Sequence, residues 1–149
     1  MTHQTYRHDF PIRIHDVDAA GIVFFARYYV LMHDVYESFL DSIGFSISSV
    51  LNAGDIIIPV VESHCRYRRP MRHGETITGE ITLAELKHTS YIVRCRFLGP
   101  DGGLRALLTV RHVSVSQQSM KPVAMPDGMR GALGRYLALD PSGAAGLAN

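Results

Sequence analysis

Two aspartates precede a long helical stretch, in the segment HDVDAAGIVFF at residues 15–25. The beginning of a helix presents unpaired backbone N–H groups and a partial positive charge. An aspartate there either caps the helix or supplies a carboxylate for chemistry beside those groups. Asp18 lies seven residues before Phe25, whereas a cap belongs at the first turn. If the helix begins near Phe25, the intervening loop can fold the Asp18 carboxylate back toward the free N–H groups. Spacing alone leaves both interpretations open.

Basic and polar residues gather in two further places that could bind an anion. The stretch HCRYRRPMRH at 64–73 includes Arg69, and Lys87, His88 and Ser90 stand at an expected turn between two strands. Such residues either contact phosphate groups or protect strand ends as solvated charges. The chain has eight histidines, but none has a spacing typical of a metal site, so we expect no metal. The sequence also lacks a serine nucleophile elbow and a glycine-rich nucleotide loop.

Composition narrows the class of protein. A length of 149 residues fits a single domain, expected over 1–139 and followed by a flexible tail at 140–149. The net charge of +1 argues against a general nucleic-acid binder. The longest apolar run, at 56–61, is far shorter than the roughly 18 residues of a membrane span, and no secretory signal is evident. Cys65 and Cys95 are expected as reduced thiols, which favours the cytoplasm.

The hydrophobic pattern predicts an α+β domain. Apolar residues recur at helical spacing from Tyr28 to Ile43, and Gly44 stands where a left-handed residue would end the helix. A helix of this length must bury its apolar stripe, and a sheet is the partner available. The expected elements are a strand at 6–14, the helix, a loop at 45–55, strands at 56–68, 75–86, 90–98 and 104–115, and a short helix at 130–139.

Apolar residues on the expected outer face of the sheet exceed what a solvated face normally carries. They are Leu107, Val113 and Val115. This surplus predicts that protomers associate.

The pattern D-x-D-x-A-G-I-V-F-F at 16–25 resembles the 4-hydroxybenzoyl-CoA thioesterase family of hotdog-fold proteins. Within that family the chain is most similar to aromatic acyl-CoA hydrolases such as the 1,4-dihydroxy-2-naphthoyl-CoA thioesterases. The similarity covers roughly residues 6–126. The motif at 16–25 is its most specific part, and weaker matches extend it along the chain. Those weaker matches are His33, Tyr36, Glu37, Leu40, 58–61, 69–70, 74–75 and 111–113. The resemblance implies a hotdog fold, in which one long central helix is wrapped by a curved, mostly antiparallel five-stranded sheet.

The resemblance also implies roles for particular residues. Asp18 matches the catalytic carboxylate, which attacks the thioester carbonyl or deprotonates a water that does so. The backbone N–H of Phe25 matches the donor that binds the thioester oxygen, and Gly21 lets the backbone approach the substrate closely. Tyr28 suits a flat aromatic acyl group, although it would serve equally as helix core. The CoA phosphates are expected at the turn formed by Lys87, His88 and Ser90, with Arg69 as a further basic contact.

The implied activity is hydrolysis of an aromatic acyl-CoA, without a cofactor, by a homodimer that associates further as a dimer of dimers. Two alternatives remain: a short-chain acyl-CoA or acyl-carrier-protein thioesterase of the same fold, and a non-catalytic acyl-CoA binding module. Two positions depart from the family pattern, because Glu62 replaces a histidine and Arg27 replaces a common asparagine. Both are expected near the acyl group.

Overall fold

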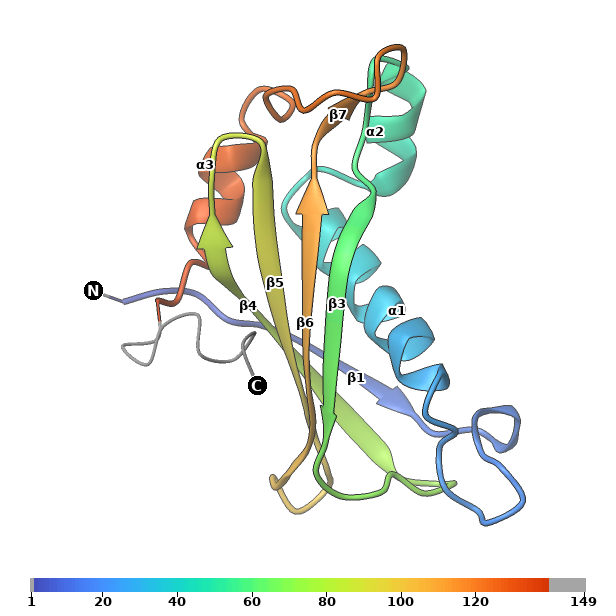
Figure 1. The fold of residues 1–149 in the computed structure, drawn as a ribbon. Helices are drawn as coiled ribbons and strands as arrows, with labels where there is room; N and C mark the ends of the chain where they lie inside the picture. The colour runs from blue at the N-terminus through green and yellow to red at the C-terminus, as the bar shows by residue number, and fades with distance from the viewer. Residues whose placement is uncertain (1, 140–149) are drawn as a thin grey trace.

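The computed structural model describes residues 2–139, and the predicted tail at 140–149 lies outside the described residues (Figure 1). The described chain alternates strands with three α-helices and one 3₁₀ turn. In chain order the elements are β1 (Tyr6–Pro11), η1 (Ile14–Asp16), α1 (Arg27–Ser42), α2 (Ile47–Ala53), β2 (Ile56–Ile57), β3 (Val60–Tyr67), β4 (Thr76–Leu86), β5 (Ser90–Leu98), β6 (Leu104–Val113), β7 (Val115–Ser116) and α3 (Met129–Gly134).

Five strands form one antiparallel sheet in the order β1-β4-β5-β6-β3, and β2 pairs with β7 in a small second sheet. The strands twist and curve, and α1 lies along one side of them (Figure 1). This arrangement confirms the predicted hotdog fold. Because β3 stands at the end of the order, one of its edges has no neighbouring strand among the described residues.

The core lies between α1 and the inner face of the sheet. On α1 the buried side chains recur at helical spacing and form the stripe that the sequence predicted. On β5 the inward residues alternate with outward ones, as a half-buried strand requires. Gly79 faces the helix at its closest approach, since an added Cβ there would lie 2.8 Å from a methyl group of Val35. Gly44 follows α1 with a φ of +85°, which confirms the predicted helix end.

The predicted loop at 45–55 is wrong, because these residues contain α2. The Ser46 side chain caps this helix by accepting a hydrogen bond from the backbone N–H of Ser49 at 3.1 Å, and Gly54 ends it in the left-handed conformation. Seven residues rich in serine and β-branched side chains have low helix propensity, so the caps were the main signal.

Two predicted strands are each divided. Pro59 lacks a backbone N–H and separates β2 from β3 within the predicted strand 56–68. The predicted strand 104–115 divides at Ser114, beyond which β7 turns away to pair with β2. The first strand is shorter than predicted and ends at Pro11.

The predicted apolar outer face is also wrong in part. Val115 is buried in the small sheet formed by β2 and β7 and does not lie on the outer face. The outer face instead carries ion pairs. Glu80 accepts from Arg7 at 2.6 Å and from Arg96 at 3.3 Å, and Arg111 bonds Glu85 at 2.6 Å. Ion pairs therefore share this face with Leu107 and Val113, which lie there half-buried as predicted.

Candidate active site

A short hairpin between β1 and α1 holds Asp18. Val17 and Val23 form an antiparallel bridge, and the backbone N–H of Asp18 donates to the carbonyl of Ile22 at 2.9 Å. The N–H of Gly21 closes the turn on the Asp18 carbonyl at 2.9 Å, and Gly21 has a φ of +78°. A turn followed by a left-handed glycine is a common way to close such a hairpin. The turn therefore uses a left-handed backbone conformation that glycine adopts readily.

The Asp18 carboxylate is exposed, and a hydrogen bond to one of its two oxygens holds it in place. Its Oδ1 accepts a hydrogen bond from the backbone N–H of Ala20 at 2.8 Å, which fixes the side chain over its own turn. Its Oδ2 has no partner among residues 2–139. Asp18 does not cap α1, because the cap position belongs to Ala26 and no side chain bonds there. The carboxylate is thus oriented but free on one side.

Asp16 has the opposite surroundings. Its side chain is buried, with the residue only 3 % exposed. Oδ1 accepts from Nε of Arg27 at 2.7 Å, and Oδ2 accepts from the backbone N–H of Arg13 at 2.8 Å. The Asp16 carbonyl also accepts the N–H of Phe24 at 3.2 Å. Asp16 therefore connects the 3₁₀ turn to the start of α1, and Arg27 is its ion-pair partner on the helix.

The helix begins two residues later than the sequence suggested. α1 starts at Arg27, whose N–H bonds the Phe24 carbonyl at 2.8 Å, so Phe25 lies in the turn before the helix. The backbone N–H of Phe25 has no partner within the described residues, whereas its carbonyl accepts from the Tyr67 hydroxyl at 3.1 Å. A fixed, unpaired donor thus stands at the positive end of α1.

Asp18 and Phe25 line one open cleft of about 480 Å³. The full lining is Asp18, Ile22, Val23, Phe24, Phe25, Tyr28, Tyr67, Arg68, Arg69 and Pro70. Tyr28 and Tyr67 meet edge to face with ring centroids 4.8 Å apart. The cleft joins a carboxylate and a backbone donor to aromatic walls. It is suited to an acyl group whose carbonyl develops negative charge during attack.

The arginine-rich wall of the cleft is anchored from β6. Arg105 donates to the Pro70 carbonyl at 2.7 Å and grips Glu75 with both terminal nitrogens, at 2.9 and 2.7 Å. Hydrogen bonding from Arg105 lowers the pKa of Glu75, so this pair stays charged at neutral pH. Arg69 is exposed and contacts Asp101 at 3.2 Å. It lines the cleft, and its role as a basic contact for CoA stays a prediction.

The structure does not bring Lys87, His88 and Ser90 to this cleft. They form the turn between β4 and β5, which Figure 1 shows at the opposite end of the sheet from the loop that carries Asp18. β5 alone spans about 30 Å at 3.4 Å per residue. Lys87 is exposed and lies 3.7 Å from Glu85. Their assignment to the CoA phosphates stays a prediction that one protomer cannot satisfy by itself.

Glu62 does not line the cleft that holds Asp18, and its expected place near the acyl group stays a prediction. It is exposed on the outer side of the sheet and lies 3.6 Å from Arg111. Cys65 and Cys95 are free, as predicted. Burial raises the pKa of the Cys65 thiol to about 11 and that of Cys95 further, so neither is a ready nucleophile.

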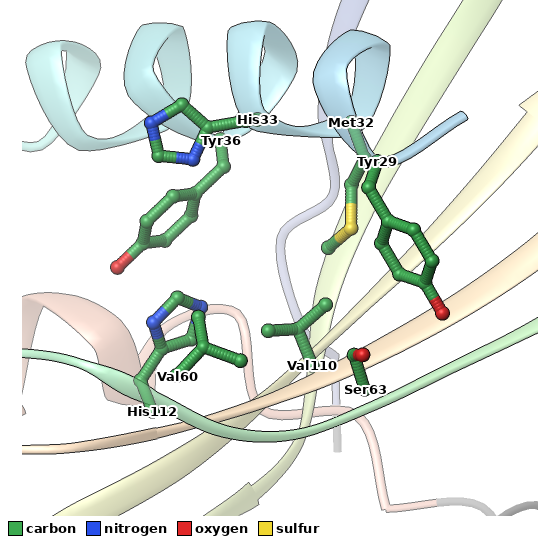
Figure 2. Close-up of a pocket in the computed structure, with 8 residues that line it drawn as sticks. All are labelled: Tyr29, Met32, His33, Tyr36, Val60, Ser63, Val110 and His112. Carbon is green, nitrogen blue, oxygen red and sulfur yellow. The ribbon is translucent and has the colours of Figure 1, made fainter. Parts of the chain in front are cut away.

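Sequence reasoning missed a second hollow, between α1 and the strands β3 and β6 (Figure 2). It has a volume of about 270 Å³ and is lined by Tyr29, Met32, His33, Tyr36, Val60, Ser63, Val110 and His112. We call it the helix–sheet slot. His112 is buried on β6 in step with Val110 and Leu108. The alternation of that strand could have placed it inward.

Two structural findings concern other classes of site. Across residues 2–139, no group of three or more His, Cys, Asp and Glu side chains is arranged to hold a metal ion. Among the same residues, no helix is both long and apolar enough to cross a membrane. His33 and Glu37 form an exposed contact of 3.5 Å, one helical turn apart.

A long helix packed on a curved antiparallel sheet, with a carboxylate at the start of that helix, defines a hotdog protein with an enzyme-like cleft. The family model of the thioesterase-like superfamily matches residues 12–133, and the chain belongs to this superfamily. The 1,4-dihydroxy-2-naphthoyl-CoA hydrolase of Rippkaea orientalis (strain PCC 8801 / RF-1) is 28 % identical over 120 residues, which are 79 % of this chain and 87 % of that protein.

Solved structures give the same result for the fold. The chain is similar to the gentisyl-coenzyme A thioesterase BH1999, with a TM-score of 0.77 and 27 % identity over 86 % of this chain and 99 % of that one. It is also similar to Slr0204, a 1,4-dihydroxy-2-naphthoyl-CoA thioesterase from Synechocystis. That structure has a TM-score of 0.83 and 21 % identity, over 88 % of this chain and 96 % of the other.

Proposed function

We propose that this protein is an acyl-CoA thioester hydrolase that acts on aromatic acyl-CoA esters of the hydroxybenzoyl or dihydroxynaphthoyl kind. The observation that carries the proposal is the cleft shared by the Asp18 carboxylate and the unpaired N–H of Phe25. The activities named for the similar proteins support an aromatic acyl group.

In the proposed reaction, the thioester carbonyl oxygen first accepts a hydrogen bond from the backbone N–H of Phe25. Negative charge develops on that oxygen, and a helix terminus stabilises it. In one route, Oδ2 of Asp18 bonds to the carbonyl carbon, the C–S bond breaks, and water hydrolyses the resulting anhydride. In the other route, Asp18 removes a proton from the water that attacks the carbonyl carbon, and the C–S bond then breaks. In either route CoA leaves as a thiolate that takes a proton from solvent. Both yield the free acid and CoA, and neither needs a metal or another cofactor.

We further propose a homodimer formed through the free edge of β3. That strand is largely exposed and presents Val60, Val61 and Tyr67 to solvent. Exposed apolar edge strands pair readily with other strands. In such a dimer, β3 pairs antiparallel with the β3 of the second copy about a two-fold axis. The end of one protomer that carries Lys87 then lies beside the end of the other protomer that carries Asp18. CoA held by the second copy would then serve the first copy's cleft.

The wider assembly and location are part of the proposal. A dimer of dimers would use the outer face of the sheet, where Leu107 and Val113 lie beside the ion pairs. The two free thiols are compatible with the cytoplasm, where disulfides are rare.

The experiment that tests the activity is thiol release from benzoyl-, 4-hydroxybenzoyl-, dihydroxynaphthoyl-, hexanoyl- and palmitoyl-CoA. We expect turnover of an aromatic member, and a fall of about 100- to 10,000-fold in Asp18→Asn. The asparagine keeps an oxygen for the N–H of Ala20, so the turn survives and only the carboxylate is lost. Equal activity of the variant would refute the role of Asp18.

Other results of the same panel separate the alternatives. Preference for hexanoyl- or palmitoyl-CoA would keep the mechanism and replace the aromatic substrate class. Turnover only of acyl groups carried by acyl carrier protein would replace the carrier. Binding of CoA esters without turnover would favour a non-catalytic binding module.

Mixed dimers test whether CoA is held across the interface. We expect Lys87→Glu to raise KM with little change in kcat, because it reverses a charge that contacts phosphate. Mixing it with Asp18→Asn and allowing subunits to exchange should create sites with an intact Asp18 and an intact Lys87, and so a low-KM fraction. Mixing without such a fraction would place each site within one protomer.

A further inference from the structure

The helix–sheet slot has the lining and the size of a site for an aromatic ring. Tyr29, Met32 and Tyr36 on α1 face Val60 and Val110 across it (Figure 2). A neighbouring hollow of about 240 Å³ shares four of its lining residues and extends the slot under α2. Each hollow exceeds the engineered apolar cavity of about 150 Å³ that binds benzene in another protein.

One polar group stands in this apolar setting without a partner. His112 is 4 % exposed, and neither Nδ1 nor Nε2 makes a hydrogen bond within the described residues. The Ile58 carbonyl lies near the ring without the geometry of a hydrogen bond. Burial, aided by the charge of His33, lowers the pKa of His112 to about 4, so the imidazole is neutral at neutral pH. A neutral imidazole offers one donor and one acceptor.

The surroundings fix the orientation of His112 without satisfying it. Its ring stacks on Tyr36 with centroids 4.5 Å apart and on Tyr91 with centroids 5.1 Å apart. The hydroxyls of these two tyrosines bond each other, and neither bonds the imidazole. A phenylalanine would stack as well, without the free energy that burying two unpaired nitrogens costs. The two nitrogens of His112 are therefore better suited to hydrogen-bonding a ligand than to packing in the core.

We propose that His112 is a specificity residue that hydrogen-bonds a ring hydroxyl of the acyl group bound in the helix–sheet slot. The inference rests on the proposed function and names the feature of the substrate that is recognised. The slot walls hold the ring by apolar contact, and a ring nitrogen of His112 pairs with the hydroxyl. An unsubstituted ring would leave that nitrogen unpaired, so the slot distinguishes hydroxylated aromatic acyl groups from plain ones.

The reach of the acyl group decides which carboxylate this slot serves. Phe25 and Tyr36 are eleven residues apart along the chain, which is about 16 Å at 1.5 Å per helical residue. One or two fused rings do not span that distance from a thioester held at Phe25 of the same protomer. The slot of one protomer therefore serves the Asp18 of a second copy, in agreement with antiparallel pairing of the β3 edges.

The test compares kcat/KM for 4-hydroxybenzoyl-CoA and benzoyl-CoA in wild type, His112→Leu and His112→Asn. We expect the wild type to prefer the hydroxylated ester by about tenfold or more, as one buried hydrogen bond supplies. His112→Leu should bring the ratio close to one through a loss on the hydroxylated ester, and His112→Asn should retain part of the preference. Thr109→Val is the matched control, because the Thr109 hydroxyl is also buried and unpartnered but does not line the slot.

Equal losses on both esters in His112→Leu would make His112 a packing residue and overturn the inference, while leaving the hydrolase proposal intact. A wild type without preference for the hydroxylated ester would overturn it as well. Equilibrium binding of free 4-hydroxybenzoate and benzoate separates the two proposals. Tighter binding of the hydroxylated acid, abolished in His112→Leu, would support the slot even in a protein that hydrolyses no ester.

Discussion

The two aspartates of the 15–25 segment are only two positions apart and have different tasks. Asp16 is buried and bonded on both oxygens, to Arg27 and to the N–H of Arg13. Asp18 is exposed and bonded on one oxygen, to the N–H of Ala20. A fully bonded buried carboxylate stabilises the fold, whereas an oriented carboxylate with a free oxygen can react.

Replacing each aspartate by alanine should therefore separate stability from activity. Asp16→Ala leaves the Arg27 guanidinium and the N–H of Arg13 unpaired, and we expect the free energy of unfolding to fall by about 2 kcal/mol. Asp18→Ala should change it by less than about 1 kcal/mol while abolishing hydrolysis. Urea unfolding and thiol release measure the two effects. Equal destabilisation by both variants would contradict the division of roles.

His112 also predicts how stability depends on pH. Its pKa is about 4 in the folded protein, below the ordinary 6.5, chiefly because burial disfavours the charged imidazole. The unfolded chain therefore binds a proton between pH 6.5 and 4 that the folded chain refuses. Stability is fully present above pH 6.5 and should fall by about 3 kcal/mol as the pH drops toward 4.

Urea unfolding at pH 7 and pH 5 checks this, with His112→Leu as the comparison. The variant should lose about 2 kcal/mol less than wild type between these two values. His33, which faces His112 from α1, contributes to the shift, so His33→Gln should reduce the difference slightly. An identical pH dependence in wild type and His112→Leu would show that other groups cause the acid sensitivity.

At the scale of the element, the hairpin at 17–23 is what turns the chain back to the start of α1. Its closure depends on the left-handed backbone of Gly21. No atom lies within 4 Å of a Cβ built there, so the restriction is conformational and not steric crowding. The element therefore couples one glycine to the position of the Asp18 carboxylate.

A pair of Gly→Ala variants tests this coupling. Gly21→Ala should destabilise the protein by roughly 1 kcal/mol and lower kcat, because the loop must strain or move. Gly131 in α3 has equal space but an ordinary helical backbone, so Gly131→Ala should stabilise by about 1 kcal/mol and leave kcat unchanged. Thermal unfolding and thiol release are the measurements. A normal kcat in Gly21→Ala would show that the loop tolerates the change.

For the whole molecule, the open question is what covers the free edge of β3 and the mouth of the helix–sheet slot. Both lie on the same side, since Val60 belongs to the strand and also lines the slot. Val61, beside it, is 58 % exposed. A second copy placed on this edge would cover the apolar side chains and bring its Lys87 turn, which we propose binds CoA, to the cleft.

A charge at this edge should separate the protomers. In Val61→Lys an unpaired charge would be buried at the interface, at about 3 kcal/mol, so the dissociation constant should rise about 100-fold and turnover should fall with it. Leu139→Lys is the control, because Leu139 is 73 % exposed and follows Ala138, whose N–H bonds Leu83 on β4, a strand that β5 and β6 separate from β3. Light scattering at micromolar concentration measures the oligomeric state. A monomeric wild type would overturn the dimer.

The sequence by itself determined the elements and the chemistry of the junction. The apolar stripe of α1 and the alternation of β4 and β5 are local patterns, because helical and extended backbones impose fixed side-chain periods. The same pattern explains why α2 was missed, since its seven residues are held by caps at Ser46 and Gly54 rather than by an apolar stripe. Pro59 and Ser114 divided strands that appeared continuous by hydrophobicity alone.

Only the tertiary structure decided which residues meet. Residue spacing could not show that Asp16 pairs with Arg27 or that one oxygen of Asp18 stays free. Both depend on how the hairpin folds back on α1. Spacing could not show that Lys87 lies at the far end of the sheet, or that His112 is stranded between two tyrosines. Burial and unpaired atoms arise from contacts between distant segments, and a linear pattern does not record such contacts.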